Sequence, residues 1–568
     1  MRSLLLLLCL SLARTKGAAA SDYTLPFMVN LDQERKVCLK WGFDNQKGEI
    51  EFKLVVNTTG WIGFGFSPNG DMIGADIVIG GVNSNGSYFT DRHGIGKFKP
   101  VIDKLQSYTL LSLTEVDGQT SMWFRRSIRT CDDEDFDITD DPIKLIYAYG
   151  NTDNIEYHNN RRGTKEVNLL NYMPRTVLSN PSYLSATVVN ITVPPVHTYY
   201  HCKVMKFSNI NTKRHIYRIE PVIEHHDIVH HMLLYSCPST VRVTYDKQCF
   251  QGDAGDACYG VVAAWAVGGG AIELPENAGI PVGGDGRDIY YRLEIHYNNP
   301  HLHAGRTDSS GLKLYHTAQL RQHDVGILTT GVLPFSSMVY SIPPKASQFL
   351  TYGVCNTSLI TQSNDPVPDL QMFAVLLHTH LAGRKVRVAQ YRDGKQIDFL
   401  AVDENYNFEM QTIVSLGEIK TIKQDDEIAV ECTYNTVDRT NVTKMGIATT
   451  DEMCLAFLFY YPAIEITSCI SHPITMSQSD TSNQTSTETW DHDTITQQEN
   501  LLKTLPQLQI ISNNEYNHTY YDNGIIREMM ETPKPQSCHY SNASNRLYTS
   551  WLMDPAGIML LLVWIALM

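Results

Sequence analysis

The sequence predicts an all-β protein, built of β-sandwiches or barrels, from three observations. Short segments that alternate apolar with polar residues, or are rich in β-branched residues, recur along the chain, as in EFKLVV, ADIVIGGV, KVRVAQY and EIAVECTY. Turn-forming residues separate these segments, and Asp393-Gly394 lies between two of them, which is the chemistry of a tight hairpin. Long apolar stripes with a helical period are scarce, so helices should be few.

The length of the chain predicts several domains. At 568 residues, and with about 150 residues per domain, three or four domains are expected. A first block ends near residue 150, in the polar and turn-rich stretch AYGNTDNIEYHNNRRG, and a seam lies around residues 316–345. Beyond residue 475, MSQSDTSNQTSTETWDHDT is rich in Ser and Thr, which favours a linker or an exposed loop.

The N-terminus is typical of a secretory signal peptide. One early Arg precedes an apolar run from Leu4 to Leu12, and the small residues Ala18 to Ala20 suit cleavage. The run is shorter than the roughly 20 residues that a membrane-spanning helix needs. We therefore predict cleavage near Ala20 rather than an N-terminal anchor.

Glycosylation acceptors and cysteines agree with export. Of the twelve cysteines, Cys9 leaves with the signal peptide, and most of the other eleven are expected in disulfides. Their odd number leaves one cysteine unpaired or in an intermolecular bond. The N-x-S/T acceptors are Asn57, Asn85, Asn190, Asn356, Asn441, Asn483, Asn517 and Asn542.

The charge of the chain argues against one class of partner. The formal net charge is −15, and basic runs are short, as in GRKVRV. Nucleic acid is therefore not an expected partner.

Two groups of histidines are candidate metal ligands. His230 and His231 precede an apolar run, and His296 lies within the strand-like segment YRLEIHYNNP. Imidazoles on a sheet suit copper or zinc. Because neighbouring strand residues point to opposite faces, His230 and His231 share one ion only if the strand is bulged or ends there. These residues alone are compatible with two interpretations, a metal site and a His-rich polar segment.

The second group follows a buried strand. FAVLLHTHLAGRKV places His378 and His380 two residues apart after five apolar residues, so that in a strand both project from one face. This spacing suits a metal ion, although a hydrogen-bonded pair in the core would have the same pattern.

Several stretches together resemble the copper type II, ascorbate-dependent monooxygenases, and most of all their dopamine β-hydroxylase-like branch. They follow the order of that family over roughly residues 195–465 and are VHHM at 229–232, CYGVVAAWAVGG from Cys258, EIHYNNP from Glu294, GRTDSSGLKLY from Gly305, HTHLAGRKV from His378, and ECTYNT with DEMCLAFLFYYP around Met453.

The resemblance implies two copper ions per chain and ascorbate as electron donor. His230, His231 and His296 would hold an electron-transfer copper. His378, His380 and Met453 would hold the copper that meets O₂, and these three are the expected catalytic residues. The ligand chemistry agrees, because a thioether favours Cu(I). Only the flanking DEMC match distinguishes Met453 from a core methionine.

The family pairing of cysteines implies five disulfides. Cys38 is then the remaining thiol, and Leu359 stands where a further cysteine of dopamine β-hydroxylase is expected. The implied pairs are Cys131–Cys538, Cys202–Cys249, Cys237–Cys258, Cys355–Cys469 and Cys432–Cys454.

The N-terminal block resembles a DOMON domain through GWIGFGFSPNGDMIGADIVIGG. We expect an interaction or stabilising role for it, rather than haem bound through Met72 and His93. The fold implied is a DOMON β-sandwich followed by two jelly-roll-like β-sandwich copper domains. The expected ranges are 1–20 for the signal peptide, 35–150 for the DOMON domain, 180–320 and 340–475 for the copper domains, 476–545 for the linker and C-terminal extension, and 546–568 for a hydrophobic tail.

The resemblance implies an enzyme that hydroxylates an aliphatic C–H bond with O₂ and ascorbate. An amine related to phenylethylamine or a peptidyl-glycine would be the substrate. A surface or secreted protein that binds copper without turnover is the alternative. The sequence does not determine the oligomeric state, and a homo-oligomer is one possible partner arrangement.

The C-terminus predicts membrane attachment. The apolar stretch from Ala556 to Met568 is thirteen residues long, which is short of the roughly 20 that a spanning helix needs. Small residues from Asn542 to Ser544, a spacer and an apolar end match a glycolipid-anchor signal. A single-pass helix remains the alternative if Leu547 to Met553 joins the stretch. The catalytic core would then face the lumen or the cell exterior.

Overall fold

The computed structural model describes residues 25–532, except for residues 33, 45–46, 140–142, 171–180, 208–209, 226, 268, 285–288, 333–340, 361–366, 475–489 and 516. Within these residues the secondary structure is almost entirely β-strand, with a single α-helix. The all-β prediction is confirmed. The signal peptide, Cys538, Asn483, Asn542 and the C-terminal tail lie outside the described residues.

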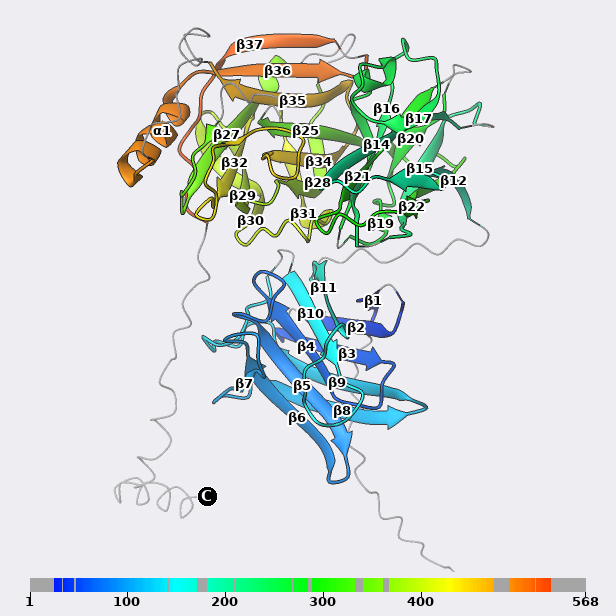
Figure 1. The fold of residues 1–568 in the computed structure, drawn as a ribbon, viewed down its shortest axis with the longest axis vertical. Coiled ribbons are helices and arrows are strands. Elements are labelled where there is room, and N and C mark those ends of the chain that lie inside the picture. The colour runs from blue at the N-terminus through cyan, green and yellow to red at the C-terminus, as the bar shows by residue number, and fades with distance from the viewer. Residues whose placement is uncertain are drawn as a thin grey trace, which may run out of the picture. The chain divides into compact units, whose positions relative to one another are not determined.

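The N-terminal block is a sandwich of two antiparallel sheets (Figure 1). One sheet has the order β1-β2-β3-β9-β8, and its strands are β1 Phe27–Asn30, β2 Val37–Asp44, β3 Glu49–Val56, β9 Gln119–Ser127 and β8 Tyr108–Val116. The other has the order β11-β10-β4-β5-β6-β7, with β11 Arg162–Val167, β10 Ile143–Tyr149, β4 Ile62–Ser67, β5 Asp76–Asn83, β6 Gly86–His93 and β7 Val101–Ile102.

Aromatic side chains fill the core of this sandwich. Trp41, Phe52, Phe64 and Phe124 are buried between the sheets. They come from strands that alternate inward apolar residues with outward polar ones, the pattern of a half-exposed sheet. The strand β11 lies beyond residue 150, so the sheet extends past the stretch at which the sequence suggested a boundary.

The middle domain, defined here as residues 182–324, contains two main sheets. The first has the order β12-β23-β15-β20-β24, with β19 Ile272–Glu273 also paired to β15, and consists of β12 Ser182–Thr187, β23 Gly311–Thr317, β15 Arg214–Val222, β20 Ala278–Val282 and β24 His323–Asp324. The second has the order β17-β14-β21-β16-β18, with β17 Tyr245–Gln248, β14 Thr198–Lys206, β21 Tyr290–Asn298, β16 Val229–Ser236 and β18 Gly260–Ala266. A separate pair joins β13 Ile191–Val193 to β22 Arg306–Asp308.

The C-terminal domain, defined as residues 326–524, also has two main sheets. The order β31-β28-β34-β25-β35-β36-β37 comprises β31 Val414–Ile422, β28 Leu370–His378, β34 Leu455–Tyr461, β25 Gly326–Val332, β35 Ile466–Pro473, β36 Gln507–Asn513 and β37 His518–Gly524. The order β27-β32-β29-β30 comprises β27 Phe349–Asn356, β32 Glu427–Tyr434, β29 Gly383–Arg392 and β30 Lys395–Asp403. A short pair joins β26 Ser341–Ile342 to β33 Thr443–Lys444.

The expected hairpin at Asp393-Gly394 is present between β29 and β30. Both residues have positive φ, at 51° and 73°. Such angles match the right-handed twist of the flanking strands, which explains the Asp-Gly pair at this position.

The C-terminal extension is more ordered than its composition suggests. The helix α1, His492–Thr504, begins inside the Ser/Thr-rich stretch, and Asp491 caps it by accepting a hydrogen bond from the Thr494 N–H at 2.9 Å. Strand β36 then pairs with β35 and joins the main sheet. Residues 475–489 of this stretch lie outside the described residues.

The middle and C-terminal domains share one hydrophobic cluster. Met232 and Ile295 of the middle domain belong to it together with Ile327, Leu455 and Phe457 of the C-terminal domain. Because these apolar side chains are removed from water together, the two domains pack as one body. This shared cluster lies next to the histidines described below.

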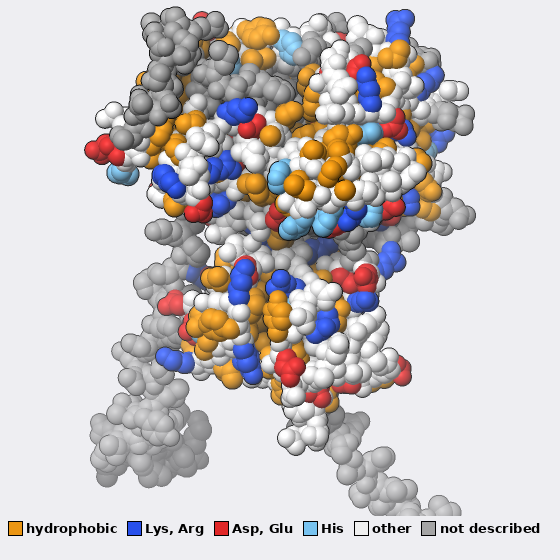
Figure 2. Space-filling model, in the orientation of Figure 1, with side chains coloured by type: hydrophobic (Ala, Val, Ile, Leu, Met, Phe, Trp, Pro, Cys, Tyr) orange, Lys and Arg blue, Asp and Glu red, His pale blue; other side chains and the backbone are white. Residues whose placement is uncertain are grey.

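On the face seen in Figure 2, acidic and basic side chains are intermixed. Of the glycosylation acceptors among the described residues, Asn57, Asn85, Asn190, Asn441 and Asn517 are exposed and Asn356 is partly buried. In the described part of the chain, no helix is long and apolar enough to cross a membrane.

Candidate metal centre

A β-bulge brings the first three histidines together. Between β16 and β21, Val229 pairs with Tyr297 and His231 pairs with His296, so that His230 is an extra residue without a partner on β21. The bulge turns the side chain of His230 toward the same face as that of His231. The sequence allowed one shared ion only for a bulged or ending strand, and the strand is bulged.

The Nδ1 atoms of these histidines converge. His231 Nδ1 lies 3.3 Å from His230 Nδ1 and 3.2 Å from His296 Nδ1. Nitrogens at these separations can all reach an ion at about 2 Å, the usual metal–imidazole distance. Together with their nearly complete burial, this makes His230, His231 and His296 a three-ligand group that fits a metal ion.

The opposite ring nitrogens of two of these histidines have partners. His230 Nε2 lies 3.2 Å from the Phe408 carbonyl oxygen, and His296 Nε2 lies 3.1 Å from Thr449 Oγ1. When Nε2 carries the proton, Nδ1 keeps its lone pair for a metal. Aromatic rings hold the same imidazoles, since His296 stacks on Tyr200 at 4.5 Å between ring centroids and His230 stacks on Phe408 at 4.0 Å.

Burial keeps the histidines of the centre neutral. It lowers the pKa of His230 to about 3 and that of His378 to about 4, and it lowers the pKa of His231 and His296 well below the ordinary value. Neutral imidazole is the form that binds a metal.

The second group forms at the end of β28. His378 is the last residue of that strand and pairs with Leu455 of β34. The pairing of β28 with β34 ends at His378 and Leu455, so His380 and Met453 lie just beyond the paired residues, at the same end of the two strands. His378, His380 and Met453 are all buried.

Each histidine of the second group is oriented through Nδ1. His378 Nδ1 lies 2.6 Å from Gln411 Oε1, and His380 Nδ1 lies 3.2 Å from the Asp451 carbonyl oxygen. Both partners accept, so Nδ1 carries the proton and Nε2 is the free ligand atom. His380 Nε2 is buried and has no hydrogen-bond partner, which is an unsatisfied acceptor of the kind that a soft metal ion would bind.

Glu452 connects the two segments that carry this group. Its carboxylate accepts hydrogen bonds from the His380 N–H at 2.9 Å and from the Ala382 N–H at 2.6 Å. The residue is fully buried, and Arg439 lies 3.5 Å away. Burial raises the pKa of Glu452 to about 7, while the two N–H donors act in the opposite direction. Because Glu452 precedes Met453 in the chain, its side chain links the segment that carries Met453 to the turn that carries His380.

The two histidine groups are adjacent. The rings of His231 and His378 lie 5.3 Å apart between centroids, at nearly a right angle. The segment between β30 and β31 touches both groups, since Phe408 contacts His230 and Gln411 contacts His378. The five histidines therefore line one buried region between the middle and C-terminal domains.

Four disulfides are present among the described residues, and one of them, Cys432–Cys454, adjoins a candidate ligand in the chain. Cys237–Cys258 closes the end of β16 against the start of β18, and Cys432–Cys454 holds the residue next to Met453. The other two are Cys202–Cys249 and Cys355–Cys469. Cys38 is a free cysteine.

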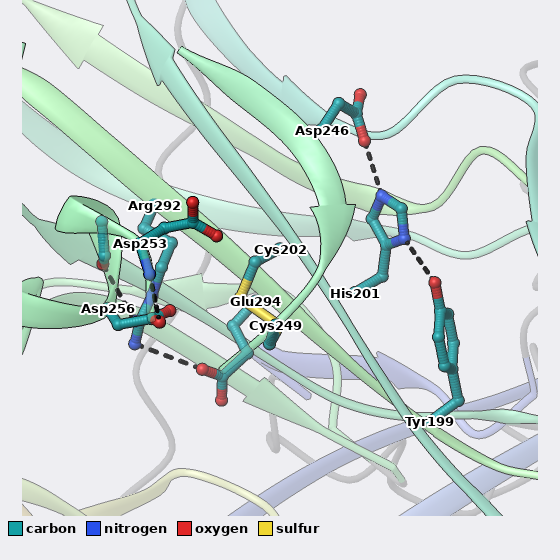
Figure 3. Close-up of a disulfide and its surroundings, with 10 residues drawn as sticks. Tyr199, His201, Cys202, Asp246, Cys249, Asp253, Asp256, Arg292 and Glu294 are labelled. Atoms are coloured by element: carbon teal, nitrogen blue, oxygen red, sulfur yellow. Dashed lines mark hydrogen bonds and ion pairs between the residues drawn. A yellow bond between two sulfur atoms is a disulfide. The ribbon is translucent and has the colours of Figure 1, made fainter. Parts of the chain in front are cut away.

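One further group of potential ligands does not fit a metal. Glu294 lies beside Cys202 and Cys249, but Figure 3 shows the two sulfur atoms bonded to each other. A disulfide offers no thiolate, so the cysteines are not ligands there. The Glu294 carboxylate instead pairs with Arg292 at 3.2 Å on the strand that carries His296.

His93, which the sequence analysis considered together with Met72 for haem, is the last residue of β6. His93 Nδ1 is hydrogen-bonded to Asp103 Oδ1.

Models of two protein families match most of the described chain. The copper type II ascorbate-dependent monooxygenase family matches with its N-terminal domain over residues 184–304 and its C-terminal domain over residues 323–481. The DOMON domain matches over residues 33–150.

Three relatives illustrate the similarity. "DBH-like monooxygenase protein 2" of Mus musculus is 38% identical over 452 residues, covering 78% of this chain and 73% of the relative. "DBH-like monooxygenase protein 1" of Homo sapiens is 37% identical over 489 residues, covering 83% and 79%. "Dopamine beta-hydroxylase" of Homo sapiens is 32% identical over 479 residues, covering 82% and 77%.

Replacing Glu452 should destabilise the C-terminal domain. Glu452→Ala leaves the His380 and Ala382 N–H groups buried without an acceptor, at a cost of roughly 1–3 kcal/mol for each group. Glu452→Gln keeps one acceptor oxygen and should cost about half as much. Thermal unfolding of the copper-free protein measures both, and unchanged unfolding of the Ala variant would contradict the role of this carboxylate.

Proposed function

The chain belongs to the copper type II ascorbate-dependent monooxygenase family, and from this premise we propose that it hydroxylates an aliphatic C–H bond of a small amine with O₂ and ascorbate. The family implies copper as the resident metal and O₂, ascorbate and an organic substrate as reactants. One observation carries the proposal for this chain: two sets of neutral, oriented imidazoles present free lone pairs in one buried region.

We assign one copper ion to each set. His230, His231 and His296 would hold the first copper through Nδ1, and their uniform imidazole set suits an ion that changes oxidation state. His378 and His380 would hold the second through Nε2, with the soft thioether of Met453 favouring Cu(I). Bound copper would supply the one-electron steps by which ascorbate and O₂ hydroxylate the substrate.

The residues of the chain contribute orientation and the exclusion of water. Gln411 and the Asp451 carbonyl fix the tautomers of His378 and His380. The shared apolar cluster around Phe457 and Leu455 shields the region from solvent. In such a low-dielectric environment the orienting hydrogen bonds are stronger than in water.

The substrate class rests on similarity alone. Human dopamine beta-hydroxylase is 32% identical to this chain, and its name states an amine substrate. A peptidyl-glycine is the other substrate class considered for this family. We favour the amine because the matched relatives belong to the dopamine β-hydroxylase-like branch.

Copper content tests the ligand assignment. The purified protein should bind about two copper ions per chain, and His378→Ala combined with His380→Ala should leave about one, because each set alone provides enough donors for one ion. Elemental analysis after loading with Cu(I) measures this. Zinc in both positions, or full copper content in the double variant, would refute the assignment.

Turnover tests the reaction. With ascorbate present, O₂ uptake should follow the addition of an amine from a panel of phenylethylamines, with one hydroxylated product per O₂ consumed. Peptidyl-glycines belong in the same panel. If copper binds as described and no compound supports uptake, the chain is a copper-binding protein without turnover rather than an enzyme.

Location follows from the disulfides and the relatives. Four disulfides and the relation to dopamine β-hydroxylase indicate the secretory pathway. We propose further that the C-terminal tail attaches the protein to a membrane through a glycolipid. A phosphatidylinositol-specific phospholipase should then release it from expressing cells, whereas complete retention would favour a single-pass helix and spontaneous appearance in the medium would mean no anchor.

A further inference from the structure

The hydrogen-bond partners of the three-histidine group come from a different domain than the histidines themselves. His230 and His296 lie on β16 and β21 of the middle domain. Phe408 lies between β30 and β31, and Thr449 lies between β33 and β34, both in the C-terminal domain. The partners of the Nε2 atoms are therefore in place only while the two domains are in contact.

We propose that Thr449 is a positioning residue that sets the tautomer of His296 from the neighbouring domain, so that copper binding by His230, His231 and His296 is coupled to the contact between the two domains. This inference rests on the proposed function, because it takes copper as the ion of this group. Thr449 itself touches the imidazole and not the metal position.

The hydroxyl of Thr449 is held in a fixed position. Thr449 Oγ1 lies 2.8 Å from Thr198 Oγ1, and the Thr449 N–H donates to the same Thr198 oxygen at 3.3 Å. Nearby, the Tyr200 hydroxyl donates to the Ile447 carbonyl at 2.9 Å. Residues 447–449 are thus bound to β14 at three points. A hydroxyl fixed in this way has a lone pair left to accept from His296 Nε2.

Only one orientation of this hydrogen bond suits a metal ligand. If Thr449 accepts from His296 Nε2–H, the Nδ1 atom of His296 keeps its lone pair toward His231. If Thr449 donated instead, Nδ1 would carry the proton and point it at the position of the ion. A metal ion therefore selects the accepting hydroxyl, and the accepting hydroxyl favours the metal-binding tautomer.

The Phe408 carbonyl acts on His230 in the same sense. A carbonyl only accepts, so His230 Nε2 must carry the proton and Nδ1 must be bare. The same carbonyl accepts from Gln411 Nε2 at 3.0 Å, and Gln411 Oε1 accepts from His378. The segment 408–411 thus orients one histidine of each group.

The consequence is a reciprocal coupling. If the domain contact raises the copper affinity of the three-histidine group, bound copper strengthens the domain contact by the same factor. Outer partners of metal-binding histidines typically change metal affinity by about 10–100-fold. Separation of the domains would remove both partners at once.

Two substitutions at Thr449 test the proposal. They are made in the background that carries His378→Ala and His380→Ala, which leaves one copper position. Thr449→Val removes the hydroxyl at nearly constant volume and should weaken Cu(I) binding by about 10–100-fold in competition with a chromophoric chelator. Thr449→Ser restores the hydroxyl and should bind within about threefold of the background protein. X-ray absorption should show a changed imidazole environment for the Val variant only.

A matched control separates this effect from loss of packing. Thr330 is fully buried on β25, and its hydroxyl has no hydrogen-bond partner. Thr330→Val makes the same chemical change at a hydroxyl that is not hydrogen-bonded to a histidine, and it should leave Cu(I) affinity unchanged. Hydrogen exchange of the copper-free proteins checks that all variants are folded.

Hydrogen exchange also measures the coupling between copper binding and the contact between the two domains. Loading the background protein with Cu(I) should protect residues 447–449 and 408–411, and Thr449→Val should reduce this protection at 447–449. Equal Cu(I) affinity and equal protection in the Val variant would overturn the proposal. If the background protein binds no Cu(I) at all, the copper assignment itself has failed, which is a different result from retained affinity in the Val variant.

Discussion

The bulge at His230 is the constraint on which the rest of the metal centre depends. In a regular strand His230 and His231 would face opposite sides of the sheet, and one of them would enter the core of the middle domain. The extra residue in β16 places the rings of His230 and His231 beside His296 of the neighbouring strand β21. The bulge also brings His230 against the Phe408 ring. The Thr449 hydroxyl contacts His296 of the same group.

Burial of five imidazoles in one region carries a cost that the fold offsets with hydrogen bonds. Buried polar groups are tolerated when their donors and acceptors have partners. In four of these rings, those of His230, His296, His378 and His380, the nitrogen that carries the proton has an acceptor nearby. The Nδ1 atoms of His230, His231 and His296 face one another, and His380 Nε2 has no hydrogen-bond partner. Without a metal, the donor nitrogens of these rings therefore have hydrogen-bond partners and the acceptor nitrogens do not. Buried acceptor nitrogens without donors are what a bound cation would satisfy.

The sequence predicted the fold class and the histidines, but not how they are supported. Strand alternation and the spacing of His378 and His380 are local patterns, so they could be interpreted from the chain alone. The role that we propose for Met453 rests on its flanking residues, because a single buried methionine is ordinary. Thr449 and Gln411 could not be identified, since each acts on a histidine far away in sequence and no local pattern marks such a contact. The helix α1 was missed because its polar composition resembles that of a linker.

The position of the disulfides has a consequence for biosynthesis. Before oxidation, Cys454 would carry a thiol directly beside Met453 in the chain. Thiolates are softer and stronger ligands for Cu(I) than either imidazole or thioether. Copper that arrived at the reduced chain would therefore be captured by the Cys454 thiolate and would oppose the pairing of Cys454 with Cys432. We therefore expect the Cys432–Cys454 disulfide to form before the chain binds copper.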